Sequence, residues 1–365
     1  MNKSLTNRQI AFIIFGIVSG YGILSLPKTI AESSGTGGWF TLLIATIIVM
    51  IFTYIITYLG YVHEDKTIYE YNQIIVGKGI ASIFIIIYCL YFFMLFTMGT
   101  RMACEAIKQT VLIKTPIWAL IMLFYLVMYY AVAKRLCTIA KVCEIYGAII
   151  IISAIVIHLA MTTQGKVINL KPFFVIEDIK EYFKATSVTI FPFLGIEILT
   201  IVPFNKKNND KNIFKYTISM VGFIGIFYIF VFESCISVME IDSIIYYQDA
   251  LFATIRRIDI ESLEFLERLD GIFLIIWIMS IFCTLTLEAY GSILLLSKFL
   301  KKINFNLISA LVFAMSFFIA LVPKTIDTAQ KILDYVGYTS IITAGLIPLI
   351  LYIITKVKKI DKKTI

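Results

Sequence analysis

Apolar residues fill long stretches of this chain, and polar residues gather in short gaps between them. Runs of about 20 apolar residues, enough to cross a bilayer as a helix, predict about ten membrane spans. Their approximate bounds are residues 9–31, 38–62, 80–104, 116–133, 142–162, 185–204, 214–238, 270–296, 305–322 and 337–355. Runs of this length favour helices over the short alternating strands of a β-barrel. The chain is therefore predicted to be an all-α integral membrane protein.

Composition supports a single transmembrane domain over residues 1–365. Hydrophobic residues make up 60% of the chain and charged residues 15%, and the mean hydropathy is +0.91. The longest polar gap, about 239–269, is shorter than the usual minimum of about 50 residues for a soluble domain. The first apolar run is too long for a cleaved signal peptide and lacks a cleavage site, so we expect it to remain in the mature protein.

The net charge of +8 comes from basic residues spread through short loops, which fits membrane topology better than nucleic-acid binding. With the N-terminus inside, the inner loops and tails hold about 19 Lys and Arg, and the outer ones about 12. Both termini are therefore predicted to be cytoplasmic. The basic runs at the termini are interpreted as topology signals or contacts with anionic lipids of the bilayer.

The outer loop at about 239–269 is acidic. Within it, Leu263, Leu266 and Leu269 recur at helical spacing among charged residues, so a short amphipathic helix is predicted. That helix either contacts a partner subunit or is an ordinary solvated helix of the loop.

Two of the spans contain helix-breaking residues at membrane depth. The first is interrupted at Gly20–Pro27 (GYGILSLP), and the sixth at Phe191–Glu197 (FPFLGIE). Unwound backbone is tolerated in a membrane mainly where it is buried in protein or lines a polar cavity. Two sets of five spans, each opening with a broken helix, predict an inverted repeat over about 9–162 and 185–355.

The two breaks together suggest a ligand site. Opposed half-helix ends offer free N–H groups for a carboxylate and free carbonyls for an ammonium group, which suits a zwitterion. Gly20, Gly22 and Gly195 permit a ligand to approach the backbone closely. The alternative for a single break is that its glycines only allow close helix packing.

Two acids lie inside apolar spans. Glu197 follows the second break and Glu288 lies in the eighth span, and an ionisable group at such depth is a candidate functional residue. The alternative is a structural ion pair, or a protonated acid hydrogen-bonded between helices.

Helical spacing brings further side chains onto common faces. Thr284 shares a face with Glu288, and Tyr91 shares one with Leu95, so the two faces could line one cavity; Tyr91 and Leu95 could equally be packing residues. Arg101 and Glu105 are also four residues apart, which predicts an intrahelical pair or an arginine that extends to the membrane surface.

Signals of enzymatic chemistry are missing from the sequence. It has no phosphate-binding loop, dinucleotide-binding motif, nucleophile elbow or zinc-protease motif. Its only histidines, His63 and His158, are far apart, and its six cysteines lack metal-ligand spacing. We therefore expect neither an enzyme nor a bound metal or cofactor.

The sequence resembles the B subunits of spore-germination nutrient receptors, over nearly the whole chain. The resemblance rests on the following segments: Gly20–Pro27, Thr100-Arg101 to Glu105 with Lys114–Ile117, Phe193–Glu197, and Glu267-Arg268 followed by Trp277. That family is itself similar to the amino acid–polyamine–organocation transporters, which implies a five-plus-five inverted repeat with ligand held by spans 1, 3, 6 and 8.

The resemblance implies a nutrient sensor in the inner membrane of a dormant spore. It would bind an amino acid or other small germinant beside an A-type membrane subunit and a C-type lipoprotein. The implied pocket residues are Gly20, Tyr21, Gly22, Ile23, Tyr91, Leu95, Leu194, Gly195, Glu197, Thr284 and Glu288. The acid at Glu288 departs from the largely neutral span expected there, and could shift preference toward an amine-bearing ligand or toward proton coupling.

Three functions stay open on the sequence alone. The first is a receptor in which germinant binding changes the bundle and signals to partner subunits. The second is a proton-coupled amino acid or amine symporter with Glu197 or Glu288 as the proton carrier. The third is an assembly subunit whose pocket binds nothing.

Overall fold

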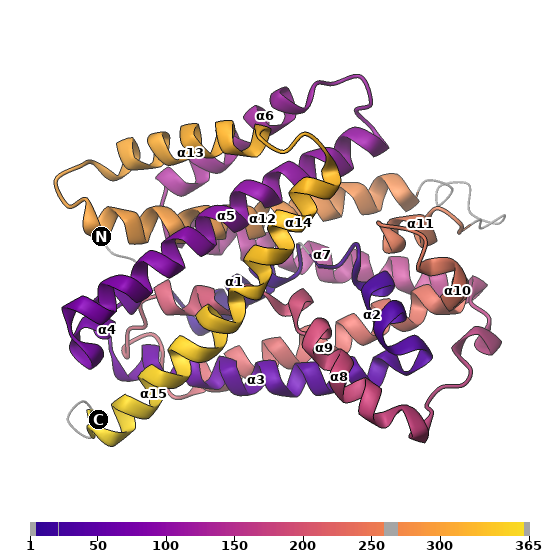
Figure 1. Ribbon diagram of the computed structural model, residues 1–365, viewed down its shortest axis with the longest axis horizontal. Coiled ribbons are helices and arrows are strands. Elements are labelled where there is room, and N and C mark those ends of the chain that lie inside the picture. Colours follow the sequence, from indigo (N-terminus) through magenta and orange to yellow (C-terminus); the bar gives the residue numbers. More distant parts are fainter. Residues whose placement is uncertain (1–4, 21, 259–268, 361–365) are drawn as a thin grey trace.

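The computed structural model describes residues 5–20, 22–258 and 269–360, and every regular element in these ranges is a helix. The helices lie side by side in an elongated bundle (Figure 1). The α-helices are α1 (Asn7–Val18), α2 (Leu26–Ser34), α3 (Gly38–Val62), α4 (Ile68–Val76), α5 (Lys78–Thr110), α6 (Ile117–Ala133), α7 (Leu136–Gln164), α8 (Ile179–Thr189), α9 (Asn212–Val238), α10 (Ile241–Ile244), α11 (Ala250–Ile255), α12 (Leu269–Phe299), α13 (Phe305–Leu321), α14 (Ile326–Tyr338) and α15 (Ile347–Val357). The shorter helical turns are η1 (Gly35–Gly37), η2 (Val167–Leu170), η3 (Ile176–Asp178), η4 (Phe191–Phe193), η5 (Ile196–Ile201) and the π-helical η7 (Ile341–Leu346).

Six helical stretches in the described ranges are long and apolar enough to cross a membrane. They are Leu26–Val62, Lys78–Thr110, Leu136–Gln164, Asn212–Val238, Asp270–Phe299 and Ile326–Val357, and three shorter apolar helices accompany them: Asn7–Val18, Ile117–Ala133 and Phe305–Leu321. Large apolar side chains such as Ile83, Leu123 and Phe318 are exposed on the outside of the bundle. Lipid-facing helices have this character, since hydrocarbon does not penalise an apolar surface.

Both predicted interruptions are present, so helices 1 and 6 are discontinuous as predicted. The first span is divided into α1, which ends at Val18, and α2, which starts at Leu26, and the described residues between them form turns. The sixth consists of α8 followed by the short turns η4 and η5. Proline at the second position of α2 and of η4 suits the start of a helical segment, where its missing N–H is not needed.

Several elements differ from the prediction where charged residues interrupt the apolar pattern. The tenth span starts at Ile326 and not near residue 337, since the first half of α14 is amphipathic. The loop after α3 contains α4, whose Thr67 and Glu70 form a reciprocal N-terminal cap. The first part of the outer loop, Ile241–Ile258, carries α10 and the buried α11. Leu263 and Leu266 lie outside the described residues, and Leu269 begins α12.

Helices at equivalent positions in the two halves of the chain pack against each other. The second span of each half, α3 and α9, pack along each other; so do the third spans, α5 and α12, and the fourth, α6 and α13. This is the packing of a five-plus-five inverted repeat, in which equivalent helices meet across a two-fold axis. Both termini lie at the same end of the bundle, away from α2, α10 and α11 (Figure 1).

Candidate functional site

The two helix breaks touch each other at the centre of the bundle. A Cβ atom added to Gly22 would lie 2.8 Å from the Cα atom of Pro192, closer than packed atoms approach. Gly195 has φ of +116°, a conformation that L residues rarely adopt, and a Cβ there would lie 2.9 Å from the side chain of Ile17. Glycine at these positions is therefore what allows the first and second breaks to pack directly together.

Side chains from two neighbouring helices satisfy the carbonyls that the first break leaves without helical partners. On α12, Trp277 Nε1 donates to the Gly20 carbonyl at 3.0 Å, and Thr284 Oγ1 donates to the Gly16 carbonyl at 2.8 Å. On α9, the Tyr228 hydroxyl lies 3.0 Å from the Val18 carbonyl. Buried carbonyls at a helix end need such partners, so α9 and α12 fix the shape of the break.

Tyr228 also connects the two breaks. Its hydroxyl lies 3.1 Å from the Pro192 carbonyl, so the single O–H donor is shared between Pro192 and Val18. The ring packs against Phe193 with centroids 5.1 Å apart. Sequence reasoning missed this residue, because a tyrosine in an apolar span is unremarkable and its partner carbonyls become known only with the fold.

Glu197 is fully buried and bonded on both carboxyl oxygens. Tyr91 on α5 donates its hydroxyl to Oε1 at 2.6 Å, and the backbone N–H of Gly195 donates to Oε2 at 3.1 Å. The carboxyl therefore holds the left-handed turn at Gly195 against α5. Both of its carboxyl oxygens are bonded to protein groups, and Glu197 does not line the cavity described next.

A cavity of about 390 Å³ lies beside the two breaks, enclosed mainly by α5, α12 and α14. Its volume is in the range of small-molecule sites. Helical periodicity explains which side chains reach it: on α12 they are Trp277, Ile281, Thr284 and Glu288, spaced by three or four residues. From Trp277 to Glu288 the helix advances about 16 Å, at about 1.5 Å per residue, so Glu288 lies at the deep end of that wall.

The structure divides the predicted site residues into two groups. Those that line the cavity are Gly22, Leu95, Leu194, Thr284 and Glu288. Those that are not part of its wall are Gly20, Ile23, Tyr91, Gly195 and Glu197. Ile23 borders a separate void of about 20 Å³ beside His158. Tyr21 lies outside the described residues.

Glu288 differs from Glu197 in its surroundings. Its side chain is 4% exposed, it lines the cavity, and its Oε2 atom has no hydrogen-bond partner in the described part of the chain. A buried carboxyl oxygen without a partner is costly, and the cost falls when a ligand supplies a donor. Glu288 is therefore the polar group best placed to meet a molecule in the cavity.

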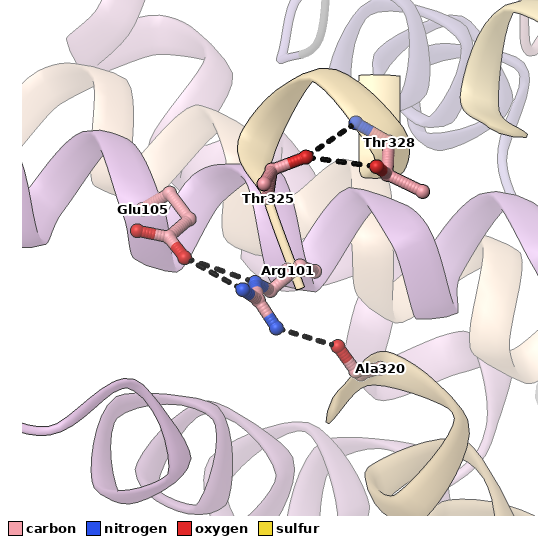
Figure 2. Close-up of polar contacts among 5 residues, drawn as sticks. All are labelled: Arg101, Glu105, Ala320, Thr325 and Thr328. Atoms are coloured by element: carbon pink, nitrogen blue, oxygen red, sulfur yellow. Dashed lines mark hydrogen bonds and ion pairs between the residues drawn. The ribbon is translucent and has the colours of Figure 1, made fainter. Parts of the chain in front are cut away.

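Arg101 and Glu105 form the predicted intrahelical pair on α5, between Leu95 and the C-terminal end of the helix (Figure 2). Arg101 Nε and Nη2 lie 3.0 and 2.9 Å from Glu105 Oε1, and Nη1 donates to the Ala320 carbonyl at 3.0 Å. Arg101 is 5% exposed, so it is buried against the end of α13 and does not extend to the surface. Thr325 caps the start of α14 beside this cluster (Figure 2).

The rim of the cavity includes polar residues that sequence reasoning missed. Gln248 and Asp249 come from the loop before α11, and Gln330 and Asp334 come from α14. Helix α11, which directly follows this loop, is held against the first break by the Leu251 N–H, which donates to the Leu24 carbonyl at 3.2 Å. Burial raises the pKa of the Asp249 carboxyl above its ordinary value. The only sequence signal for Asp249 was its place in an acidic loop.

No group of three or more His, Cys, Asp or Glu side chains that could hold a metal ion occurs within residues 5–20, 22–258 and 269–360. Of the histidines, His158 Nδ1 is 2.7 Å from Ser234 Oγ, and His63 stacks on Tyr71. Neither contributes to the cavity wall.

Solved transporter structures share this fold. Mhp1, a nucleobase-cation-symport-1 family transporter in a closed conformation with bromovinylhydantoin bound, matches with a TM-score of 0.58 at 11% identity, over 95% of this chain and 78% of its own. A Na+-coupled sialic acid symporter in a substrate-bound outward-open state matches with a TM-score of 0.59 at 14% identity, over 96% and 75%. The chain therefore has the fold of these transporters, a ten-helix inverted repeat with broken helices 1 and 6.

The family follows from the sequence matches. The family model described as spore germination protein matches residues 4–329, and the chain belongs to that family. Spore germination protein YndE of Bacillus subtilis (strain 168) is 27% identical over 364 residues, which cover 99% of each chain. Spore germination protein A2 of the same organism is 26% identical and covers 95% of this chain and 94% of the relative. These matches confirm the resemblance noted in the sequence and identify a multi-pass membrane protein of germinant-sensing or transporter-like type.

Proposed function

We propose that this protein is the membrane-embedded sensor subunit of a nutrient receptor of spores, and that it binds an amino acid or similar small polar germinant in the central cavity. The observation that carries the proposal is the cavity itself, which lies where both helix breaks meet and has the unpartnered Glu288 in its wall. Leu194, Gly22 and Thr284 would contact the ligand from the breaks and from α12.

Signalling requires that the ligand bind one conformation of the bundle better than another. A molecule in the cavity would contact both breaks, and Tyr228 already joins them through the Val18 and Pro192 carbonyls. A displacement of one break would therefore also displace the other through Tyr228. The change would pass to an A-type membrane subunit and a C-type lipoprotein, the partners that we propose for the family role.

The proposed location is the inner membrane of the spore, with both termini cytoplasmic. Both termini lie at one end of the bundle, which supports placing them on the same side of the membrane, and the excess of Lys and Arg in the inner loops and tails favours the cytoplasmic side (Figure 1). The rim residues Gln109 and Gln248 lie near the outer end of α5 and in the loop before α11, so the cavity would open toward the outside, where a germinant arrives.

A proton-coupled symporter of amino acids or amines is the second candidate. The observation that favours it is the same Glu288 carboxyl, which is buried in the cavity and could exchange a proton with a substrate or with water. The fold is also shared with symporters.

Transport and binding assays on the purified protein separate these functions. The protein would be reconstituted in liposomes, and radiolabelled amino acids and amines would be offered with and without a pH gradient. We expect saturable binding without accumulation. Accumulation driven by the gradient would instead establish the symporter, and the absence of both binding and uptake would leave only a role in assembly.

A further inference from the structure

The charged side chains around the cavity are of one sign. The lining includes the carboxyl groups of Glu105, Asp249, Glu288 and Asp334, and none of the described lining residues is Lys, Arg or His. A free carboxylate on a ligand would therefore meet no cationic side chain in this wall, whereas an amine would meet several acceptors.

Arg101 does not line the cavity, and the carboxylate that it pairs with is that of Glu105. Nε and Nη2 bind Glu105, and Nη1 binds the Ala320 carbonyl (Figure 2). Asp334 accepts a hydrogen bond from the neutral amide of Gln330 at 2.8 Å, which leaves its charge uncompensated. Glu288, Asp249 and Asp334 are thus the lining carboxyl groups that have no cationic partner among the described residues.

Glu288 is an independent indication that a ligand completes this site. It is 4% exposed, and Oε2 lacks a hydrogen-bond partner among the described residues. An ammonium group has three donors and no acceptor, so it matches an unpartnered carboxylate oxygen directly.

We propose that the cavity selects a small organic cation of net positive charge, such as an aliphatic diamine or a basic amino acid, whose ammonium group binds Glu288. This inference rests on the proposed function, since it names the ligand class for the same cavity. The apolar side chains of Leu95, Ile281 and Leu333 would pack against the methylene stem. Asp249, nearer the rim, would receive the second cationic group.

Ligands that differ only in charge test the inference. Binding of L-lysine, L-norleucine, L-glutamate and 1,5-diaminopentane to the purified full-length protein would be measured by calorimetry in nanodiscs. L-lysine and L-norleucine share the backbone and the four-carbon stem, and only lysine has the terminal amine. We expect lysine and the diamine to bind at least about tenfold more tightly than norleucine, because a buried charge pair is lost with the amine. Glutamate should bind most weakly.

Substitution then locates the charge that is recognised. Glu288→Gln should reduce lysine affinity by about tenfold or more and change norleucine affinity little. Asp249→Asn, near the rim, should cost less, about threefold, because the group is more hydrated. The matched control is Glu233→Gln, which removes a buried unpartnered carboxyl on α9 that is not part of the cavity wall, and should leave the lysine preference unchanged.

These measurements distinguish a wrong ligand class from a wrong binding site. Norleucine binding as tight as lysine binding, or a lysine preference that survives Glu288→Gln, would overturn the cation inference and leave the cavity as a germinant site. Failure of all four ligands to bind the wild-type protein would overturn the cation inference together with the proposed binding function. The wild-type ligand series decides the matter even if Glu288→Gln does not fold.

Discussion

At the scale of single residues, Gly195 is restricted both by its backbone conformation and by its neighbours. Its φ of +116° strains any other residue by about 1–3 kcal/mol, and a Cβ would also press on Ile17 across the two breaks. We predict that Gly195→Leu inserts into the membrane and accumulates but loses ligand binding and the germinant response, because the second break moves away from the first. Binding and germination assays on matched amounts of protein would check this.

A suitable control for that variant is Gly79→Leu, at the exposed start of α5, where an added Cβ has no heavy atom within 4 Å. It should behave as wild type. A normal response from Gly195→Leu would mean that the junction of the breaks is not part of the response.

Tyr228 gives a second prediction at this scale, which concerns stability. Tyr228→Phe removes the hydroxyl that serves the Val18 and Pro192 carbonyls, and each buried carbonyl left without a donor costs about 1–3 kcal/mol. We expect the midpoint of thermal unfolding of the purified protein to fall by several degrees. The control is Tyr246→Phe, since Tyr246 is 82% exposed. Equal midpoints for the two variants would show that the shared bond contributes no stability.

At the scale of elements, the corner between α3 and α4 should respond to pH. His63 follows α3, stacks on Tyr71 with ring centroids 5.3 Å apart, and has a pKa lowered to about 4 by burial and then by the nearby Lys66. The folded corner therefore holds neutral His63, while the unfolded chain takes up a proton near pH 6.5. Stability is present above pH 6.5 and is lost as the pH falls from there to about 4.

We predict that His63→Gln, which cannot take up a proton in this range, flattens that part of the pH profile. The difference in unfolding free energy between wild type and variant should change by on the order of 1 kcal/mol between pH 7 and pH 4.5, after allowance for solvent screening. Thermal unfolding of both proteins across this range measures it. If the stability of wild type and variant changed equally with pH, His63 would not be the group that causes the pH dependence.

The elements also show where sequence reasoning reached its limit. Glycine and proline at Gly20–Pro27 and Phe191–Glu197 identified both breaks, because these residues change backbone geometry wherever they occur. The first half of α14 and the rim residue Asp249 were missed. Their polar character is that of an ordinary loop, and only tertiary packing places them over a cavity.

Glu197 and Glu288 illustrate the same limit within the site. Both are acids in apolar spans, so the sequence could not separate a residue bonded to Tyr91 and Gly195 from one directed into a cavity. The distinction depends on which neighbours each side chain faces, and a shift of one or two residues in helix register would change those neighbours.

At the scale of the whole molecule, the inverted repeat predicts which end of the bundle faces the outside and which end faces the cytoplasm. Helices α10 and α11 lie at the end opposite to the termini, and the loop between them contributes Gln248 to the cavity wall; the loop between α12 and α13 lies at the same end as both termini (Figure 1). An odd number of spans in each half produces this arrangement, since the second half must enter the membrane from the other side.

Cysteine accessibility in intact cells tests this orientation and the position of the cavity together. In a background in which the two half-buried cysteines, Cys89 and Cys137, are serine, we predict that Gln248→Cys reacts with a membrane-impermeant maleimide added outside. Lys302→Cys, in the loop between α12 and α13, should react only after permeabilisation. A ligand that fills the cavity should slow labelling at Gln248→Cys severalfold and leave Lys302→Cys unaffected, because only the former lies on the rim. The reverse labelling pattern would invert the molecule in the membrane, and equal labelling with and without ligand would place the binding site away from this cavity.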